Sequence, residues 1–236
     1  MDGAPGPIRT ADPLVRSQML YPAELRALSL IVSFNQLRLM IETEIKIRFD
    51  RGSPPDARDL LERHGYTLLE PRTLESDQVF DRASSELKGA DQLLRLRRSG
   101  ARSTVTYKGP ATRERHKSRE EIEFDVSDAA AFALVLDRLG YAPRFRYEKY
   151  RTKFAAQPPE PGIITIDETP IGVFLELEGP PDWIDATAAR LGFAHSEYCT
   201  QSYTALYREY LLSHRDAPPN MEFGTGVPRD LLGKDT

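Results

Sequence analysis

The chain of 236 residues has a single cysteine, Cys199, and no run of apolar residues near the roughly 18 that a membrane-spanning helix needs. One cysteine excludes an intramolecular disulfide and any zinc site built from several cysteines. The chain also lacks the apolar segment of a signal peptide. We therefore expect a cytoplasmic protein without a membrane partner, whose fold depends on its hydrophobic core.

The chain also lacks a strong charge bias. Its 32 basic and 36 acidic residues give a formal net charge of -4, so no chain-wide attraction for a polyanion is expected. A nucleic-acid groove would place aromatic residues among the bases, whereas most tyrosines here fall at apolar positions or in the last predicted helix. We expect no nucleic-acid partner.

Three segments differ in character. Residues 1–39 show neither strand nor helix periodicity, and the stretch from Gly3 to Leu28 resembles the conceptual translation of a transfer-RNA gene region. We interpret residues 1–39 as a non-native or disordered extension, with Met40 as the true start; a genuine extension or targeting segment is the alternative. Residues 40–214 are predicted to form one domain. Residues 215–236 are predicted to be a flexible tail, in which Met221 and Phe223 are able to dock.

Alternation of apolar and charged residues begins at Met40 and predicts a strand. The same pattern recurs seven times, at Asp77–Asp81, Leu93–Arg98, Ser103–Gly109, Lys117–Val126, Phe145–Ala155, Ile163–Asp167 and Val173–Glu178. Between the strands lie three predicted helices, each ended by a glycine: Pro55–His64, Asp128–Leu139 and Asp182–Leu191. A last helix, Gln201–Ser213, carries a stripe from Tyr203 to Tyr210 that is typical of core packing or, alternatively, of a homodimer face.

These elements predict an α+β fold in which an eight-stranded antiparallel β-barrel has its helices packed outside. The apolar strand faces would then lie under the helices, and the charged faces would point into the barrel. The run from Arg113 to Lys117, which overlaps the start of the strand Lys117–Val126, is interpreted as an exposed, solvated hairpin loop, with a mobile lid over the barrel as the alternative. The inward faces carry seven acids and seven bases: Glu42, Glu44, Lys46, Arg95, Arg97, Lys108, Arg119, Glu121, Glu123, Lys149, Arg151, Asp167, Glu176 and Glu178.

Both signs of charge in one interior suit a particular ligand. Carboxylates spaced two apart on a strand direct their oxygens to one volume, as Mg²⁺ or Mn²⁺ requires. Arginine and lysine suit anionic oxygens, and guanidinium groups match phosphate bidentately. A linear triphosphate with divalent ions needs this combination, whereas a glycosidase carboxylate pair would not call for so many bases.

Several motifs resemble the CYTH superfamily, the triphosphate tunnel metalloenzymes. They are Glu42-Thr-Glu-Ile-Lys46, Leu94-Arg-Leu-Arg97, Thr106-Tyr-Lys-Gly-Pro110, Arg119-Glu-Glu-Ile-Glu123, Lys149-Tyr-Arg151, Ile164-Thr-Ile-Asp167 and Gly172-Val-Phe-Leu-Glu-Leu-Glu178. The resemblance runs from about Met40 to Tyr210. It implies an eight-stranded tunnel that binds a triphosphate, such as ATP or inorganic triphosphate, together with Mg²⁺ or Mn²⁺.

The resemblance also implies roles for the inward residues. Glu42, Glu44 and Lys46 would be the catalytic group. Metal would be bound by Glu42, Glu44, Glu176 and Glu178, with Glu121, Glu123 and Asp167 at or near it. The phosphates would be bound by Lys46, Arg95, Arg97, Lys108, Arg119, Lys149 and Arg151.

Two reactions share such a site. Attack by water on the terminal phosphorus would make the protein a triphosphatase. We rank this reaction first because hydrolysis places fewer requirements on the site than cyclisation does. Attack by the ribose 3'-hydroxyl of ATP on the α-phosphorus would make it a class IV adenylyl cyclase. The string Asp77-Gln-Val-Phe-Asp81 resembles this branch of the family more than it resembles the animal thiamine triphosphatases. A third hypothesis is a polyphosphate- or nucleotide-binding module without turnover, but such a binder gains nothing from the metal-type carboxylates.

Overall fold

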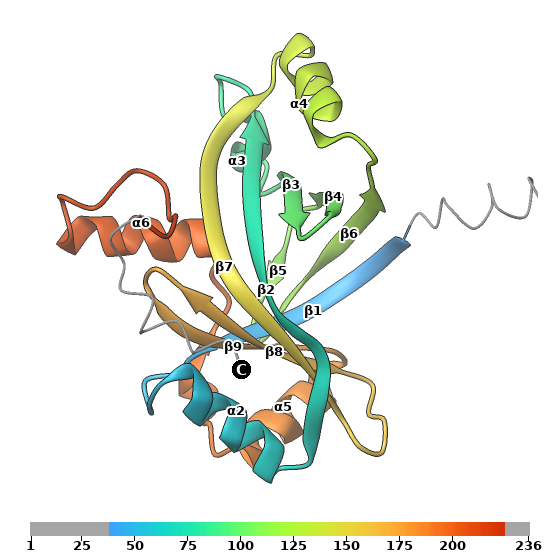
Figure 1. Cartoon of the computed structure of the whole chain (residues 1–236), viewed down its shortest axis with the longest axis vertical. Helices are drawn as coiled ribbons and strands as arrows, with labels where there is room; N and C mark the ends of the chain where they lie inside the picture. The colour runs from blue at the N-terminus through green and yellow to red at the C-terminus, as the bar shows by residue number, and fades with distance from the viewer. Residues whose placement is uncertain (1–37, 225–236) are drawn as a thin grey trace, which may run out of the picture. The chain divides into compact units, whose positions relative to one another are not determined.

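The computed structural model describes residues 38–224, and within this range eight strands form a closed antiparallel barrel (Figure 1). Around the ring they are β1 (Arg38–Arg48), β9 (Gly172–Glu178), β8 (Ile163–Thr169), β7 (Ala142–Ala156), β2 (Tyr66–Asp81), β3 (Leu93–Ser99), β4 (Arg102–Lys108) and β6 (Lys117–Asp125). The predicted barrel is confirmed. Most of the predicted N-terminal extension and the end of the predicted tail lie outside the described residues.

Strand β1 closes the ring because it pairs on both sides. It runs against β6 from Arg38↔Glu123 to Glu44↔Lys117, and against β9 from Glu44↔Glu178 to Arg48↔Phe174. Two short strands, β5 (Thr112–Arg113) and β10 (Tyr198–Cys199), pair with β6 and β1 outside the eight-membered ring.

Strand β2 is much longer than the sequence pattern predicts. It starts at Tyr66 and not at Asp77, and it pairs with β7 along most of its length. The pairing shifts register between Leu68 and Glu70 and again between Glu70 and Thr73. Such irregularities break the two-residue period, which explains why the first half of β2 carries no clear alternation.

Four helices lie where the sequence predicts them: α2 (Pro54–Arg63), α4 (Ala129–Arg138), α5 (Pro181–Arg190) and α6 (Tyr203–Ser213). Gly65 and Gly140, just beyond α2 and α4, both have φ of 83°, a conformation that favours glycine and ends a helix. The short helices α3 (Glu86–Gly89) and η2 (His195–Glu197) have no counterpart in the prediction. Among the residues that the structure describes, no helix is both long and apolar enough to cross a membrane.

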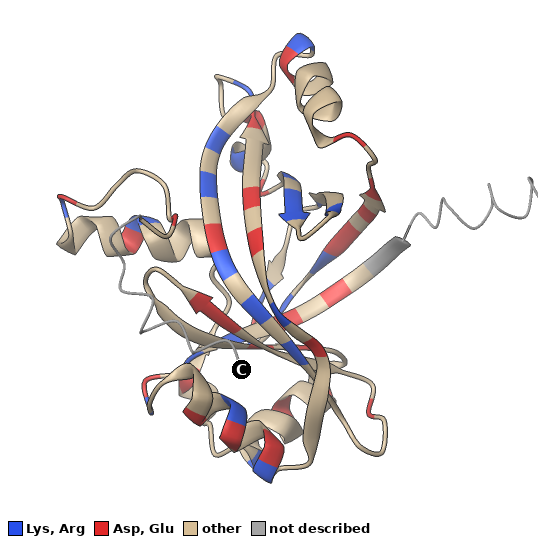
Figure 2. Ribbon diagram, viewed as in Figure 1, with Lys and Arg blue, Asp and Glu red and all other residues tan. Residues whose placement is uncertain are grey.

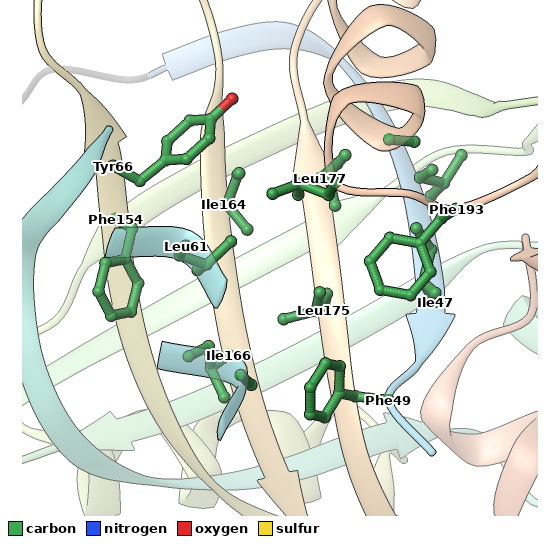
Figure 3. Packing of buried hydrophobic residues seen from close by; sticks show 14 of the residues in the cluster. Ile47, Phe49, Leu61, Tyr66, Phe154, Ile164, Ile166, Leu175, Leu177 and Phe193 are labelled. Carbon is green, nitrogen blue, oxygen red and sulfur yellow. The ribbon is translucent and has the colours of Figure 1, made fainter. Parts of the chain in front are cut away.

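The largest core lies between the barrel wall and helices α2 and α5. Figure 3 shows how Leu61 of α2 packs over Ile164 and Phe154, while Leu175 and Leu177 pack beside Phe193. All six of these side chains are at most 4% exposed. These strands are thus covered by apolar packing outside and carry their charges inside.

A second core holds α6 against β7. Tyr207 and Phe145 lie with ring centroids 5.8 Å apart, and the hydroxyl of Tyr207 donates to the carbonyl oxygen of Pro218 at 2.6 Å. Met221 is fully buried and bridges to Tyr147. The chain after α6 is therefore docked through this segment, while the rest of the predicted flexible tail lies outside the described residues.

Candidate active site in the barrel

Charged residues are interspersed with uncharged ones along the barrel strands, as the coloured bands on β2 and β7 in Figure 2 show. Inside lies a cavity of about 320 Å³. Its charged lining consists of eight bases, Lys46, Arg95, Arg97, Lys108, Arg119, Lys149, Arg151 and Lys153, and six acids, Glu42, Glu44, Glu121, Glu123, Glu176 and Glu178. This excess of two bases in the lining is offset by the buried acids Glu75, Asp77 and Asp167, which pair with four of these bases, so the barrel interior carries both signs of charge without a net positive excess.

The structure brings the predicted site residues together. Thirteen of the fourteen line this cavity, and the exception is Asp167, which is fully buried. The carboxylate of Asp167 accepts four hydrogen bonds. Lys149 Nζ donates to Oδ2 at 2.8 Å, the Tyr203 hydroxyl donates to Oδ2 at 2.7 Å, and Arg151 donates from Nε at 2.6 Å and from Nη2 at 2.5 Å. Asp167 thus holds one lysine and one arginine of the predicted phosphate-binding set.

Two further acids, which the sequence analysis missed, support the arginines of β3. Asp77 is fully buried and accepts from Arg97 Nε at 2.9 Å, and Arg97 Nη1 lies 2.8 Å from Glu75. Burial alone would raise the pKa of Glu75, but the charges of Arg97, Lys149 and Arg151 outweigh it and lower that pKa to about 2. Glu75 is therefore ionised and fixes the surrounding cations.

A different environment surrounds the carboxylates near β1 and β9. Lys108 forms an ion pair with Glu42 and another with Glu121 at 2.9 Å. Burial raises the pKa of Glu42, although Lys108 opposes this. Burial and the neighbouring Glu42 raise the pKa of Glu178 to about 7. For both groups burial is the largest cause of the raised pKa, and neighbouring carboxylates add to it.

Lys46 and Lys117 converge on Glu44. Lys46 Nζ lies 3.1 Å from Glu44 and 3.0 Å from Glu176, and Lys117 forms a short hydrogen bond to Glu44. Strand β6 begins at Lys117, as predicted, but the solvated environment predicted for this residue is wrong, because its side chain is only 2% exposed. Burial lowers the pKa of Lys117 to about 8, against the raising effect of Glu44. Its two-residue spacing from Arg119 was the signal for an inward position.

Arg119 differs from the other bases of the lining. It is 9% exposed, its Nε has no hydrogen-bond partner, and within residues 41–224 it forms no ion pair. Its charge contributes to lowering the pKa of Asp91, but Asp91 is not at ion-pair distance. A buried guanidinium without a direct ion pair is costly unless a ligand supplies one. Arg119 is therefore available to an anion in the cavity.

The donor chemistry of the acidic corner fits a divalent cation. Glu42, Glu44, Glu121 and Glu178 offer hard carboxylate oxygens, which Mg²⁺ and Mn²⁺ prefer. Burial raises the pKa values of Glu42 and Glu178, so a bound cation would stabilise their ionised forms, whereas neighbouring cations outweigh burial and lower the pKa values of Glu44 and Glu121. In the described part of the chain no three metal-binding side chains stand close enough to hold an ion as they lie, and Lys108 pairs with two of these carboxylates. A bound metal would therefore replace lysine contacts.

Uncharged residues complete the lining, and the sequence analysis missed them. They are Leu93, Tyr147, Ile163, Thr165, Ser202, Tyr203 and Thr204. Tyr147 lies two residues before the inward-facing Lys149, so the two-residue period of the strand could have predicted its position. The positions of the residues at the start of α6 were not predictable in this way, because only the packing of that helix brings them to the barrel.

Comparison with known proteins places this site in context. A family model described as the CYTH domain matches residues 40–189. A Methanocaldococcus jannaschii protein named "putative adenylate cyclase" is 29% identical over 139 residues, which cover 59% of this chain and 77% of that protein.

Solved structures share the fold. A Vibrio parahaemolyticus protein described as a "putative adenylate cyclase" matches with a TM-score of 0.61 and 17% identity, over 72% of this chain and 99% of that one. A Pyrococcus horikoshii protein matches with a TM-score of 0.58 and 25% identity, over the same shares of the two chains.

Proposed function

Because the chain belongs to the CYTH family, whose model matches residues 40–189, we propose that it is a metal-dependent enzyme that hydrolyses a triphosphate and releases phosphate. One observation carries the proposal. A single cavity joins an acidic corner, in which the pKa values of Glu42 and Glu178 are raised, to a basic wall held by buried carboxylates. A triphosphate with its divalent ions has the matching distribution of charge.

Different residues of the cavity have different proposed roles. Glu42, Glu44, Glu121 and Glu178 would hold Mg²⁺ or Mn²⁺, with Glu123 and Glu176 on the same lining. When bound, the metal would polarise the phosphoryl group and neutralise developing charge. Arg95, Arg97, Lys149 and Arg151 would bind and orient the phosphate oxygens, and Arg119 would find its counter-charge there. Since four donors already engage Asp167, its proposed role is to orient cations and not to bind metal.

The second candidate is adenylyl cyclase activity, with ATP as substrate and cyclic AMP and pyrophosphate as products. It is favoured by the name of the Methanocaldococcus jannaschii relative. The same cavity would bind the triphosphate in either reaction. The difference lies in whether water or the ribose 3'-hydroxyl is placed in line with a phosphorus atom. A cytoplasmic location and the absence of a nucleic-acid partner complete the proposal.

The experiment is a product analysis. The protein is incubated with ATP and separately with inorganic triphosphate, each with Mg²⁺, with Mn²⁺ or with EDTA, and the products are separated by chromatography. Metal-dependent orthophosphate supports hydrolysis. Cyclic AMP with pyrophosphate would replace the first candidate by the second. Binding without turnover under all conditions would refute both enzymes and leave a triphosphate-binding module.

A further inference from the structure

Tyr203 reaches the barrel interior from outside the barrel. It is the first residue of α6 and lies beyond residues 40–189, the segment that the family model matches. The Ser202 side chain caps the helix by accepting from the backbone nitrogen of Ala205 at 3.3 Å. The Tyr203 side chain is 5% exposed and, with its neighbours Ser202 and Thr204, lines the cavity.

Its side chain touches groups from three strands. The hydroxyl donates to Oδ2 of Asp167 on β8 at 2.7 Å. The ring faces two ammonium groups, with Lys46 Nζ on β1 5.3 Å and Lys149 Nζ on β7 5.0 Å from its centroid. Both distances allow a cation–π interaction, which gains strength away from water. A space-filling core tyrosine would not need these contacts.

Packing fixes the ring in this position. Phe174 meets it edge-on with centroids 5.5 Å apart, and Tyr147 lies 6.1 Å away. The helix behind it is held by Tyr207, which binds Pro218, and by the buried Met221. The C-terminal segment thus anchors the helix that carries Tyr203.

We propose that Tyr203 is a positioning residue for substrate phosphates, acting through Asp167. Asp167 accepts from both Lys149 and Arg151, so the orientation of its carboxylate sets where these two cations stand in the cavity. The Tyr203 hydroxyl fixes that carboxylate, and its ring restricts the two ammonium groups. This inference rests on the proposed function, because it assigns Lys149 and Arg151 to the phosphates of that substrate.

The test compares two conservative variants on the same helix. Tyr203→Phe keeps the ring and removes the bond to Asp167. Tyr207→Phe is the matched control, since Tyr207 is 2% exposed and donates to a backbone oxygen away from the cavity. For triphosphate turnover with Mg²⁺ or Mn²⁺, Tyr203→Phe is expected to raise KM about tenfold, the size expected for losing a hydrogen bond to a charged group. We expect kcat to change less, and Tyr207→Phe to leave KM unchanged.

A double-mutant cycle with Asp167→Asn separates positioning from packing. If Tyr203 acts through Asp167, Tyr203→Phe adds little to KM in the Asp167→Asn background. Additive effects would overturn the proposal. If Asp167→Asn does not fold, the KM comparison between the two tyrosine variants decides, and equal KM values would overturn it. Wild-type protein that neither binds nor hydrolyses a triphosphate would overturn the proposed function and this inference together.

Discussion

Arg97 Nη1 lies 2.8 Å from Oε2 of Glu75, on neighbouring strands inside the barrel. The arginine belongs to the proposed phosphate-binding wall, and the glutamate supplies the charge that allows it to be buried. Such a pair is costly to break from one side, because the remaining charge stays buried without compensation. The supporting acids therefore contribute to stability as well as to the site.

Glu75→Gln should remove an acid-sensitive part of the free energy of unfolding. The pKa of Glu75 is about 2 in the fold against an ordinary value of 4.5. Its contribution is present above pH 4.5 and lost as the pH falls towards 2, because the unfolded chain takes up the proton first. A shift of this size corresponds to about 3 kcal/mol. Urea denaturation between pH 7 and pH 2.5 should show a lower and flatter stability curve for the variant.

The control for this experiment is Glu86→Gln, since the Glu86 side chain is 60% exposed in its ion pair with Arg82. That variant should follow the wild-type pH profile. If the Glu75 variant also runs parallel to wild type, Glu75 does not carry the proposed charge.

Glu44→Gln should abolish metal-dependent turnover, and the variant should still fold, with lower stability because Lys46 and Lys117 lose a buried counter-charge. The change removes an anionic oxygen donor from the acidic corner and leaves Lys46 and Lys117 facing an amide. We expect kcat to fall by at least about 100-fold, as when one charge-stabilising group is removed from an active site. Circular dichroism checks the fold, and Glu62→Gln on the exposed face of α2 is the matched control.

Lys46→Met should weaken triphosphate binding, since it removes a base from the cavity lining. Calorimetric titration with inorganic triphosphate measures the effect. Wild-type activity and affinity in both the Lys46 and the Glu44 variants would refute the assignment of the barrel interior as the active site.

Arg119→Gln and Arg97→Gln should separate binding from stability. Both changes remove a cation from the lining, so both should weaken triphosphate binding by about tenfold. Only Arg97 is tied to buried acids, at Glu75 and Asp77. The midpoint of thermal unfolding should therefore fall for the Arg97 variant and stay or rise for the Arg119 variant. Equal losses of stability would show that Arg119 has a structural counter-charge.

Leu61→Ala should destabilise the fold without touching the site. Leu61 is fully buried between α2 and the barrel wall, and such truncations cost about 2–5 kcal/mol. Chemical denaturation measures the loss, and KM should be unchanged below the unfolding range. Leu212→Ala, at a side chain that is 78% exposed, should alter neither quantity.

The barrel and most of its inward residues were predictable because a strand has a two-residue period. Once Ile45 and Ile47 are assigned to the outer core, Glu44 and Lys46 must face inward. Glu75 escaped prediction because register shifts in β2 break the period upstream of it. For Lys117 the start of the strand was predicted, but the neighbouring charged residues of the hairpin led to the wrong prediction that its side chain is solvated.

The position of Tyr203 in the cavity was not predictable from the sequence for a different reason. The spacing of the tyrosines on α6 correctly indicated a packed face, and Tyr207 meets that expectation. The helical period does not predict which residues the side chain at the start of the helix will contact. Its contact with Asp167 depends on how α6 docks across the barrel, a tertiary relationship between residues 36 positions apart.

The double pairing of β1 also bears on how the chain folds. The first strand of the barrel meets β6 about midway through the domain and β9 near its end, so the ring closes only after β9 has been made. Contacts this distant in sequence make folding slow. During synthesis β1 would remain unpaired until its partner strands are made. The charges at Glu42, Glu44 and Lys46 would keep one face of the unpaired segment hydrated. The side chains proposed for chemistry would thus also protect the nascent chain from aggregation.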